Sequence, residues 1–158
     1  CVTESSQKQL STNCQLDGVL DDGKHDYHLR VQYEDTDAGG IVYHAQYLAF
    51  AERARSAWLR CLDIDQPRLL SQEKQAFVVR HIDIDFLQAA TLGDVLGVSS
   101  EIVKIGGARV TLRQTITKMQ FCLIVARLVV DIGFVNLQRA GVARPCRMPQ
   151  DIRKKLAG

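Results

Sequence analysis

Hydrophobic periodicity along the chain predicts one long helix, which begins near Tyr47 and ends at Leu62. Apolar residues recur in this segment at spacings of three and four, and neither glycine nor proline interrupts it. That spacing is typical of an amphipathic α-helix. The apolar positions are Tyr47, Leu48, Phe50, Ala51, Ala54, Ala57, Trp58, Cys61 and Leu62. Because the remaining polar face is narrow, we expect the helix to be mostly buried.

Strands are predicted on both sides of this helix, where apolar and polar residues alternate. The predicted strands are residues 27–33, 77–87, 95–104, 109–118 and 121–134, with a short helical link at 69–75. The strand at 121–134 is apolar on both faces for much of its length, which is typical of a central strand. Gly106 and Gly107 mark a hairpin turn. One helix followed by strands joined by short turns predicts an α+β fold, in which an antiparallel sheet of about five strands wraps one long central helix.

Composition indicates a single globular domain between two polar ends. Of the 158 residues, 46% are hydrophobic and 24% are charged, which is enough apolar sequence for a real core. Residues 1–26 are polar, and we expect a flexible arm there, with a short helix around Val19 as an alternative. The domain is expected to occupy residues 27–150, and residues 151–158 to form a basic tail.

Net charge and cysteine usage narrow the cellular setting. The net charge of +2 does not favour nucleic acid or an acidic membrane as a partner. The sequence shows no apolar run long enough to span a membrane and no signal-peptide pattern. The five cysteines form no CxxC pair and no metal-ligand spacing, which is typical of free thiols in a reducing compartment. We therefore expect a cytoplasmic protein.

The turn that precedes the helix carries the candidate chemistry. Val42 to Ala45 include no Ser, Thr, Asp or Asn, so the helix lacks the usual side-chain cap and its first N–H groups are free to bind a carbonyl oxygen or an anion. Gly39 and Gly40 allow another group to approach the backbone closely. An aspartate here, Asp35 or Asp37, could act as a general base or a nucleophile. The alternative is that both are ordinary turn residues, and that water or a strand satisfies the N–H groups.

A second polar cluster lies on the strand at 77–87. His81, Asp83 and Asp85 share one face and could suggest a metal site. One histidine with two carboxylates is an incomplete ligand set, so we favour a solvated strand face or a contact between subunits. We expect no metal.

The motif from Asp35 to His44, with Tyr47-Leu48 and Glu52-Arg53-Ala54-Arg55 after it, resembles the hotdog-fold acyl-CoA thioesterases of the 4-hydroxybenzoyl-CoA thioesterase-like family. Within that family it is most similar to the Tol-Pal-associated acyl-CoA thioesterases. The resemblance extends from about residue 27 to residue 149. Gln46, where Asn is common, and Ala89, where Pro is common, depart from the pattern and leave the shape of the acyl pocket open.

The resemblance implies roles for individual residues. Asp37 would be catalytic, and the backbone N–H of His44 would polarise the thioester carbonyl. Tyr43 and the His44 side chain would shape the pocket or hold Asp37, and Gly40 would let the substrate approach the backbone. Gly106 and Gly107 would lie near the CoA phosphates. The basic residues after position 138 would either attract those phosphates or form a solvated surface.

The expected function is hydrolysis of acyl-CoA to a carboxylic acid and CoA, with no cofactor. The alternative is a non-catalytic module that binds acyl-CoA or an acyl carrier protein. A hotdog dehydratase is less favoured, because no catalytic His is followed by Phe-Pro. The resemblance also implies an obligate homodimer, pairing again to a tetramer, in which Asp37 faces the neighbouring chain near His81 or Asp83.

Overall fold

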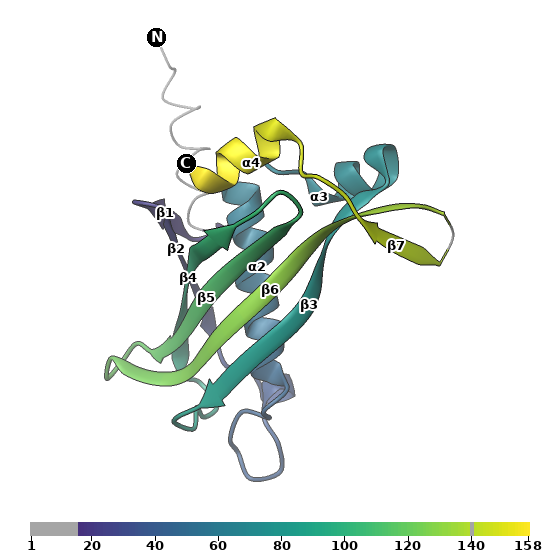
Figure 1. The fold of residues 1–158 in the computed structure, drawn as a ribbon. Helices are drawn as coiled ribbons and strands as arrows, with labels where there is room; N and C mark the ends of the chain where they lie inside the picture. The colour runs from purple at the N-terminus through teal and green to yellow at the C-terminus, as the bar shows by residue number, and fades with distance from the viewer. Residues whose placement is uncertain (1–15, 140) are drawn as a thin grey trace.

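The computed structural model describes residues 16–139 and 141–158. In these residues one antiparallel sheet curves around helix α2 (Figure 1). The strand order is β1-β2-β4-β5-β6-β3, and β7 also pairs with β6. The strands are β1 Val19–Asp21, β2 Lys24–Arg30, β3 Gln75–Phe86, β4 Val95–Ile105, β5 Arg109–Lys118, β6 Leu123–Arg139 and β7 Val142–Pro145. The predicted α+β architecture is confirmed, with seven strands in the described residues where about five were expected.

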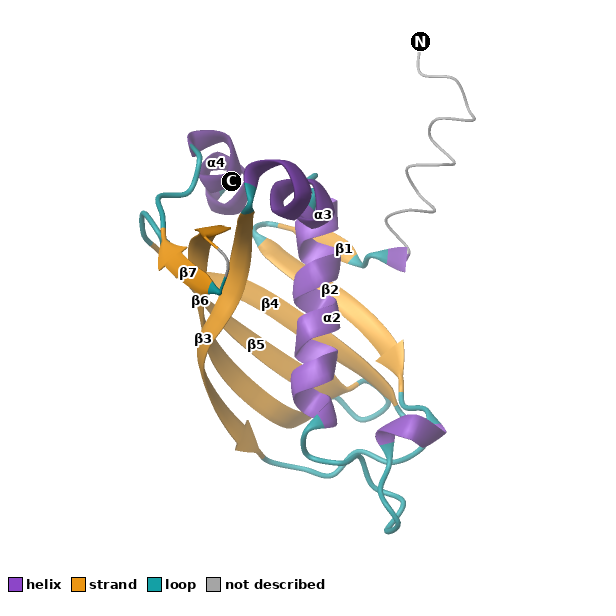
Figure 2. Cartoon of the chain, turned by 90° about the vertical axis from the view of Figure 1, so that its right-hand side faces the viewer, coloured by secondary structure: helices purple, strands orange, loops and turns teal. Residues whose placement is uncertain are grey.

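Helix α2 spans Gln46–Cys61 and lies against the concave face of the sheet (Figure 2). Phe50, Ala51 and Ala54 are fully buried there, and the small side chains of the two alanines let the helix backbone approach the strands. The shorter helical segments are η1 Tyr33–Asp35, α3 Gln66–Arg68, η2 Leu69–Glu73 and α4 Gln150–Ala157. The predicted helix therefore agrees with α2 to within about one residue at each end. No helix in the described residues is long and apolar enough to cross a membrane.

Two segments predicted to be an arm and a tail, residues 16–26 and 151–158, are more ordered than the sequence predicted. Residues 19–21 and 24–30 form an antiparallel hairpin that pairs with β4, so the described part of the expected arm belongs to the sheet. Val19 lies in a strand and not in a helix. The rest of the arm prediction, residues 1–15, lies outside the described residues. The basic tail is also a structured element, because Ile152 of α4 is buried in the core.

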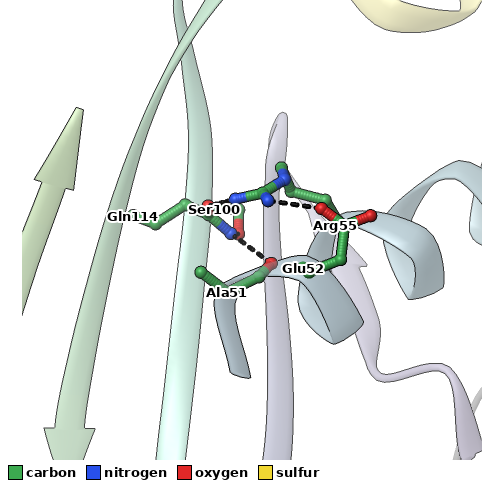
Figure 3. A network of polar contacts seen from close by, with 5 residues as sticks. All are labelled: Ala51, Glu52, Arg55, Ser100 and Gln114. Carbon is green, nitrogen blue, oxygen red and sulfur yellow. Dashed lines mark hydrogen bonds and ion pairs between the residues drawn. The ribbon is translucent and has the colours of Figure 1, made fainter. Parts of the chain in front are cut away.

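A buried polar network fixes α2 against the middle of the sheet (Figure 3). The Gln114 amide nitrogen donates to the Ala51 carbonyl oxygen at 3.1 Å and to Ser100 Oγ at 2.9 Å. The Gln114 amide oxygen accepts from the Arg55 guanidinium at 2.8 Å. Arg55 is itself paired with Glu52 on the preceding turn of α2. Both polar groups of the buried amide are thus satisfied.

His25 closes the other end of the core, where β2 meets the last turns of α2. It is fully buried, its ring lies parallel to the Trp58 ring, and its Nε2–H donates to the Asp17 carbonyl oxygen at 2.6 Å. The Asp17 carboxylate accepts from Arg60 Nε at 2.8 Å. Desolvation lowers the pKa of His25 from 6.5, against the opposing effects of the Asp17 carbonyl and the Asp26 charge. The folded state therefore favours the neutral imidazole.

Replacing Gln114 with Leu should destabilise the fold by about 2 to 3 kcal/mol, because the buried Arg55 guanidinium, the Ala51 carbonyl and the Ser100 hydroxyl each lose a hydrogen bond that no water can replace. Urea unfolding measures the change. Glu101→Gln, which removes the exposed ion pair between Glu101 and Arg113, is the control and should cost less than about 0.5 kcal/mol. Equal losses in the two variants would contradict a special role for the network.

The free energy of unfolding should fall as the pH drops below 6.5, because the unfolded chain takes up a proton on His25 that the folded chain resists. The contribution is fully present above pH 6.5 and is lost between that value and the lower folded pKa, at up to about 1.4 kcal/mol per pH unit. Urea unfolding from pH 8 to pH 5 measures it. His25→Gln should remove this part of the pH dependence, and His28→Gln, at an exposed position of the same strand, should keep it.

Candidate active site

Residues 36–45 form a tight loop that leads into the start of α2, at the lower end of the molecule in Figure 1. Thr36 pairs with Val42 across the base of the loop. The Asp37 N–H donates to the Ile41 carbonyl at 2.9 Å, and the Gly40 N–H donates to the Asp37 carbonyl at 3.0 Å. Gly40 has φ +75°, a left-handed conformation that residues with a Cβ rarely adopt. The local sequence therefore closes a compact turn that begins at Asp37.

The two aspartates of the motif have different environments. Asp37 is exposed, and its Oδ1 accepts a hydrogen bond from the Gly39 N–H at 2.8 Å. Asp35 is 1% exposed; its Oδ2 accepts from the Gln32 N–H at 2.8 Å, and its carbonyl oxygen accepts from the Tyr43 N–H at 2.9 Å. The turn-residue interpretation therefore describes both aspartates, since each hydrogen-bonds nearby backbone N–H groups, but Asp35 is buried and anchors the loop whereas Asp37 is exposed.

The helix start has free donors, as the sequence predicted. Ala45 is the N-cap of α2 and provides no side-chain hydrogen bond. The Tyr43 N–H is used by Asp35, and the Gln46 N–H donates to the Tyr43 carbonyl at 2.8 Å. Within the described part of the chain, the N–H groups of His44 and Ala45 have no acceptor. Two backbone donors at the positive end of a helix dipole can stabilise an oxyanion.

Aromatic rings surround these donors. The His44 ring lies 4.5 Å from the Tyr43 ring and 6.3 Å from the Phe86 ring, measured between centroids. The Phe86 ring also lies 5.7 Å from that of Tyr47. Phe86 ends β3 and is half exposed, so it belongs to this site although it lies 42 positions after His44 in the chain. Its sequence neighbourhood reads as an ordinary strand end, and only the fold brings it to His44.

Gly106 and Gly107 lie elsewhere in the chain. They form the hairpin between β4 and β5, where the Gly106 N–H donates to the Arg109 carbonyl at 2.7 Å. The loop of Asp37 follows β2, whose last residue pairs with Val95 at the opposite end of β4. Since β4 has 11 residues, the two glycines and Asp37 are separated by roughly 30 Å of strand. A single chain therefore does not bring them to one site.

The polar cluster of β3 forms an exposed ion pair. His81 Nε2 lies 3.2 Å from Asp83 Oδ2, and both side chains are mostly exposed. No group of three or more His, Cys, Asp or Glu side chains in the described ranges is arranged to hold a metal ion. In this chain His81 and Asp83 therefore lie on a solvent-exposed face of β3.

Comparisons with known proteins agree with this geometry. Residues 39–120, just over half of the chain, match the family described as the Thioesterase superfamily. The acyl-CoA thioesterase YbgC of Haemophilus influenzae is 40% identical over 135 residues, which cover 85% of this chain and 95% of that protein.

Solved structures give the same answer for the fold. A probable thioesterase from Bartonella henselae is 36% identical with a TM-score of 0.73, over 80% of this chain and 99% of that one. A 4-hydroxybenzoyl CoA thioesterase solved with 4-hydroxybenzoyl CoA has a TM-score of 0.79 at 14% identity, over 85% of this chain and 99% of that one.

The antiparallel sheet wrapped around one helix is a hotdog fold, and the family match places this fold in the thioesterase class. The chain belongs to the Thioesterase superfamily, and within it is similar to the YbgC acyl-CoA thioesterases.

Proposed function

We propose that this chain is an acyl-CoA thioesterase that hydrolyses the thioester to a carboxylic acid and CoA at the start of α2. The observation that carries the proposal is the pair of unbonded N–H groups at His44 and Ala45, at the end of the loop that presents the exposed Asp37. The named activity of the YbgC relatives supports the choice of substrate.

In the proposed reaction the thioester carbonyl oxygen accepts a hydrogen bond from the His44 N–H. Asp37 takes a proton from a water molecule as that water attacks the carbonyl carbon. The negative charge that develops on the carbonyl oxygen is stabilised by the backbone donors and the helix dipole. The carbon–sulfur bond then breaks, and the CoA sulfur takes the proton from Asp37. In the second route that the chemistry allows, the Asp37 carboxylate attacks the carbon, the carbon–sulfur bond breaks and CoA leaves as the thiolate. Water then hydrolyses the mixed anhydride to the free acid and the Asp37 carboxylate, and the thiolate takes up the proton that is released.

The hydrogen bond from the Gly39 N–H to Asp37 Oδ1 supports either role, because it orients the carboxylate without burying it. Tyr43, His44 and Phe86 would supply the apolar wall against the acyl group. Gly40 contributes open space, since a Cβ built there would meet no atom within 4 Å. A substrate can therefore approach the turn along its backbone.

The site is proposed to be completed by a second copy of the chain. β3 lies at the edge of the sheet, and its 12 residues present one row of backbone donors and acceptors for which the described residues offer no strand. An unpaired edge of that length is a ready template for another strand. Beside it, Phe77 and Val79 line a hollow of about 530 Å³, counting its open mouth. Antiparallel pairing of β3 with β3 would cover this edge and place the Asp37 loop of one copy near His81 or Asp83 of the other.

Such pairing also gives the basic end of the chain a role. The Gly107 carbonyl accepts from the Met148 N–H at 2.8 Å, so the glycine hairpin lies beside Arg147 and the start of α4. Arg109, Arg147, Arg153 and Lys154 gather at this end. Since a two-fold axis exchanges the ends of the two chains, the CoA phosphates of one site would meet the Gly106–Gly107 hairpin and these cations of a neighbouring copy.

Asp37→Asn should lower the turnover of acyl-CoA by roughly 10² to 10⁴, the range for loss of a general base, and leave the fold intact. Turnover of a panel of acyl-CoAs and acyl carrier protein thioesters measures it. Glu34→Gln, an exposed acidic position in η1, is the matched control and should stay near wild type. Binding of acyl-CoA without turnover in the wild-type chain would favour the non-catalytic module.

Val79→Lys should reduce the assembly to monomers and lower turnover, because it places a charge on the open edge at a side chain that is 43% exposed. Light scattering at micromolar concentration gives the mass. Val103→Lys, at a β4 position that is 50% exposed, is the control and should change neither mass nor turnover. Full activity in a wild-type species of monomer mass would refute the shared site, whether or not a tetramer forms at higher concentration.

A further inference from the structure

The loop between β3 and β4, residues 87–94, is hydrogen-bonded to residues that precede and follow His44 in the sequence. Both hydrogen bonds use the backbone of Ala90. The Ala90 carbonyl oxygen accepts from the Val42 N–H at 2.8 Å. The Ala90 N–H donates to the Tyr47 phenol oxygen at 3.2 Å. Val42 lies just before His44, and Tyr47 lies in the first turn of α2. Ala90 thus joins the end of the Asp37 loop to the beginning of the helix.

The Tyr47 hydroxyl has a defined place in this arrangement. Tyr47 is 4% exposed, and its ring lies 6.1 Å from the Phe50 ring and 5.7 Å from the Phe86 ring. Ala90 is fully buried, so its N–H has no access to water and depends on the phenol oxygen. A phenylalanine would fill the same space without accepting that hydrogen bond. The hydroxyl, and not the ring, is therefore what connects the helix start to Ala90.

The loop that carries Ala90 is itself held in place. Asp94 Oδ2 accepts from the Thr91 N–H at 2.8 Å and from Thr91 Oγ1 at 3.0 Å, and it pairs with Lys118 Nζ at 2.8 Å. Both side chains of this ion pair are largely buried, at 13% and 16% exposure. Thr91 also bridges to Ile41 in the Asp37 loop. The backbone of Ala90 is consequently held in a fixed position relative to the sheet, and the start of α2 is hydrogen-bonded to it.

We propose that Tyr47 is a positioning residue for the thioesterase reaction: its hydroxyl, acting through the Ala90 backbone, holds the free N–H groups of His44 and Ala45 at the distance from Asp37 that the reaction needs. This rests on the function proposed above. Since Tyr47 is only 4% exposed, its side chain has almost no surface with which to contact a substrate. Its hydrogen bond sets where the carbonyl oxygen binds relative to the carboxylate, so it affects the chemical step more than binding.

Tyr47→Phe tests the proposal by kinetics. Turnover number should fall roughly 10- to 100-fold, while KM for acyl-CoA stays within about threefold, because a misplaced donor weakens transition-state stabilisation and leaves the rest of the binding surface intact. Ser100→Ala is the matched control: it removes a buried hydroxyl from the Gln114 network on the same helix–sheet interface. It should lower the melting temperature by a similar few degrees and leave turnover within about twofold.

Amide hydrogen exchange provides a second measurement that does not depend on activity. In Tyr47→Phe the Ala90 and Val42 amides should exchange at least about tenfold faster, and amides in the β5–β6 ladder should not change. In Ser100→Ala the Ala90 and Val42 amides should stay protected. This result stands even if the wild-type chain turns over none of the thioesters, in which case only the proposed function fails.

Three outcomes overturn the inference. Unchanged exchange at Ala90 and Val42 in Tyr47→Phe means that the hydroxyl does not hold them. Unchanged turnover despite faster exchange means that the reaction does not need the position. An equal loss of turnover in Ser100→Ala means that general loosening of the helix, and not the Tyr47 hydroxyl, lowers the rate.

Discussion

One buried amide, that of Gln114, decides where α2 lies on the sheet. Most of the helix–sheet contact is apolar and much of the buried helix face is alanine, and apolar burial has no preferred direction. The Gln114 hydrogen bonds to Ala51 and Arg55 of α2 are directional, and any rotation or sliding of α2 would leave buried polar groups unpaired, whereas the bond to Ser100 joins Gln114 to β4 and not to the helix. Since Ala51 lies seven residues after His44, roughly 10 Å along the helix, this register determines where the helix start is presented.

In the loop before that helix start, two aspartates differ in how far they are buried. Asp35 satisfies backbone N–H groups inside the protein and anchors the loop, whereas Asp37, two residues later, is exposed at the start of the turn. The backbone donors that Asp35 and Tyr43 leave unused are those of His44 and Ala45. A carboxylate facing solvent and two unpaired N–H groups on a rigid support are the parts that thioester hydrolysis requires.

The residues of the proposed site lie at opposite ends of the sheet, and the edge strand β3 is left without a partner strand in the described residues. The Asp37 loop lies at one end of β4, and the glycine hairpin with its arginines lies at the other. A single copy separates these parts by the length of a strand, so a substrate with a reactive thioester and distant phosphates would need more than one copy to contact both. The unpaired edge of β3 and the hollow beside it are the surface through which a second copy would supply them.

The sequence by itself determined the helix, five of the seven strands of the described residues and the Asp37–His44 motif, because hydrophobic period and turn chemistry are local properties. It also indicated the uncapped helix start, since a cap requires particular residue types at a particular place. It failed for residues 19–26 and for α4, whose polar sequences become ordered only by pairing with β4 or by burying Ile152. The roles of Phe86, Ala90 and Gln114, and the distance of Gly106 from Asp37, were decided by tertiary structure alone. Contacts between residues 40 or more positions apart cannot be predicted from the local sequence around either residue. A hydrogen bond to a backbone amide, such as that of Ala90, is harder still to predict, because every residue except proline has such an amide.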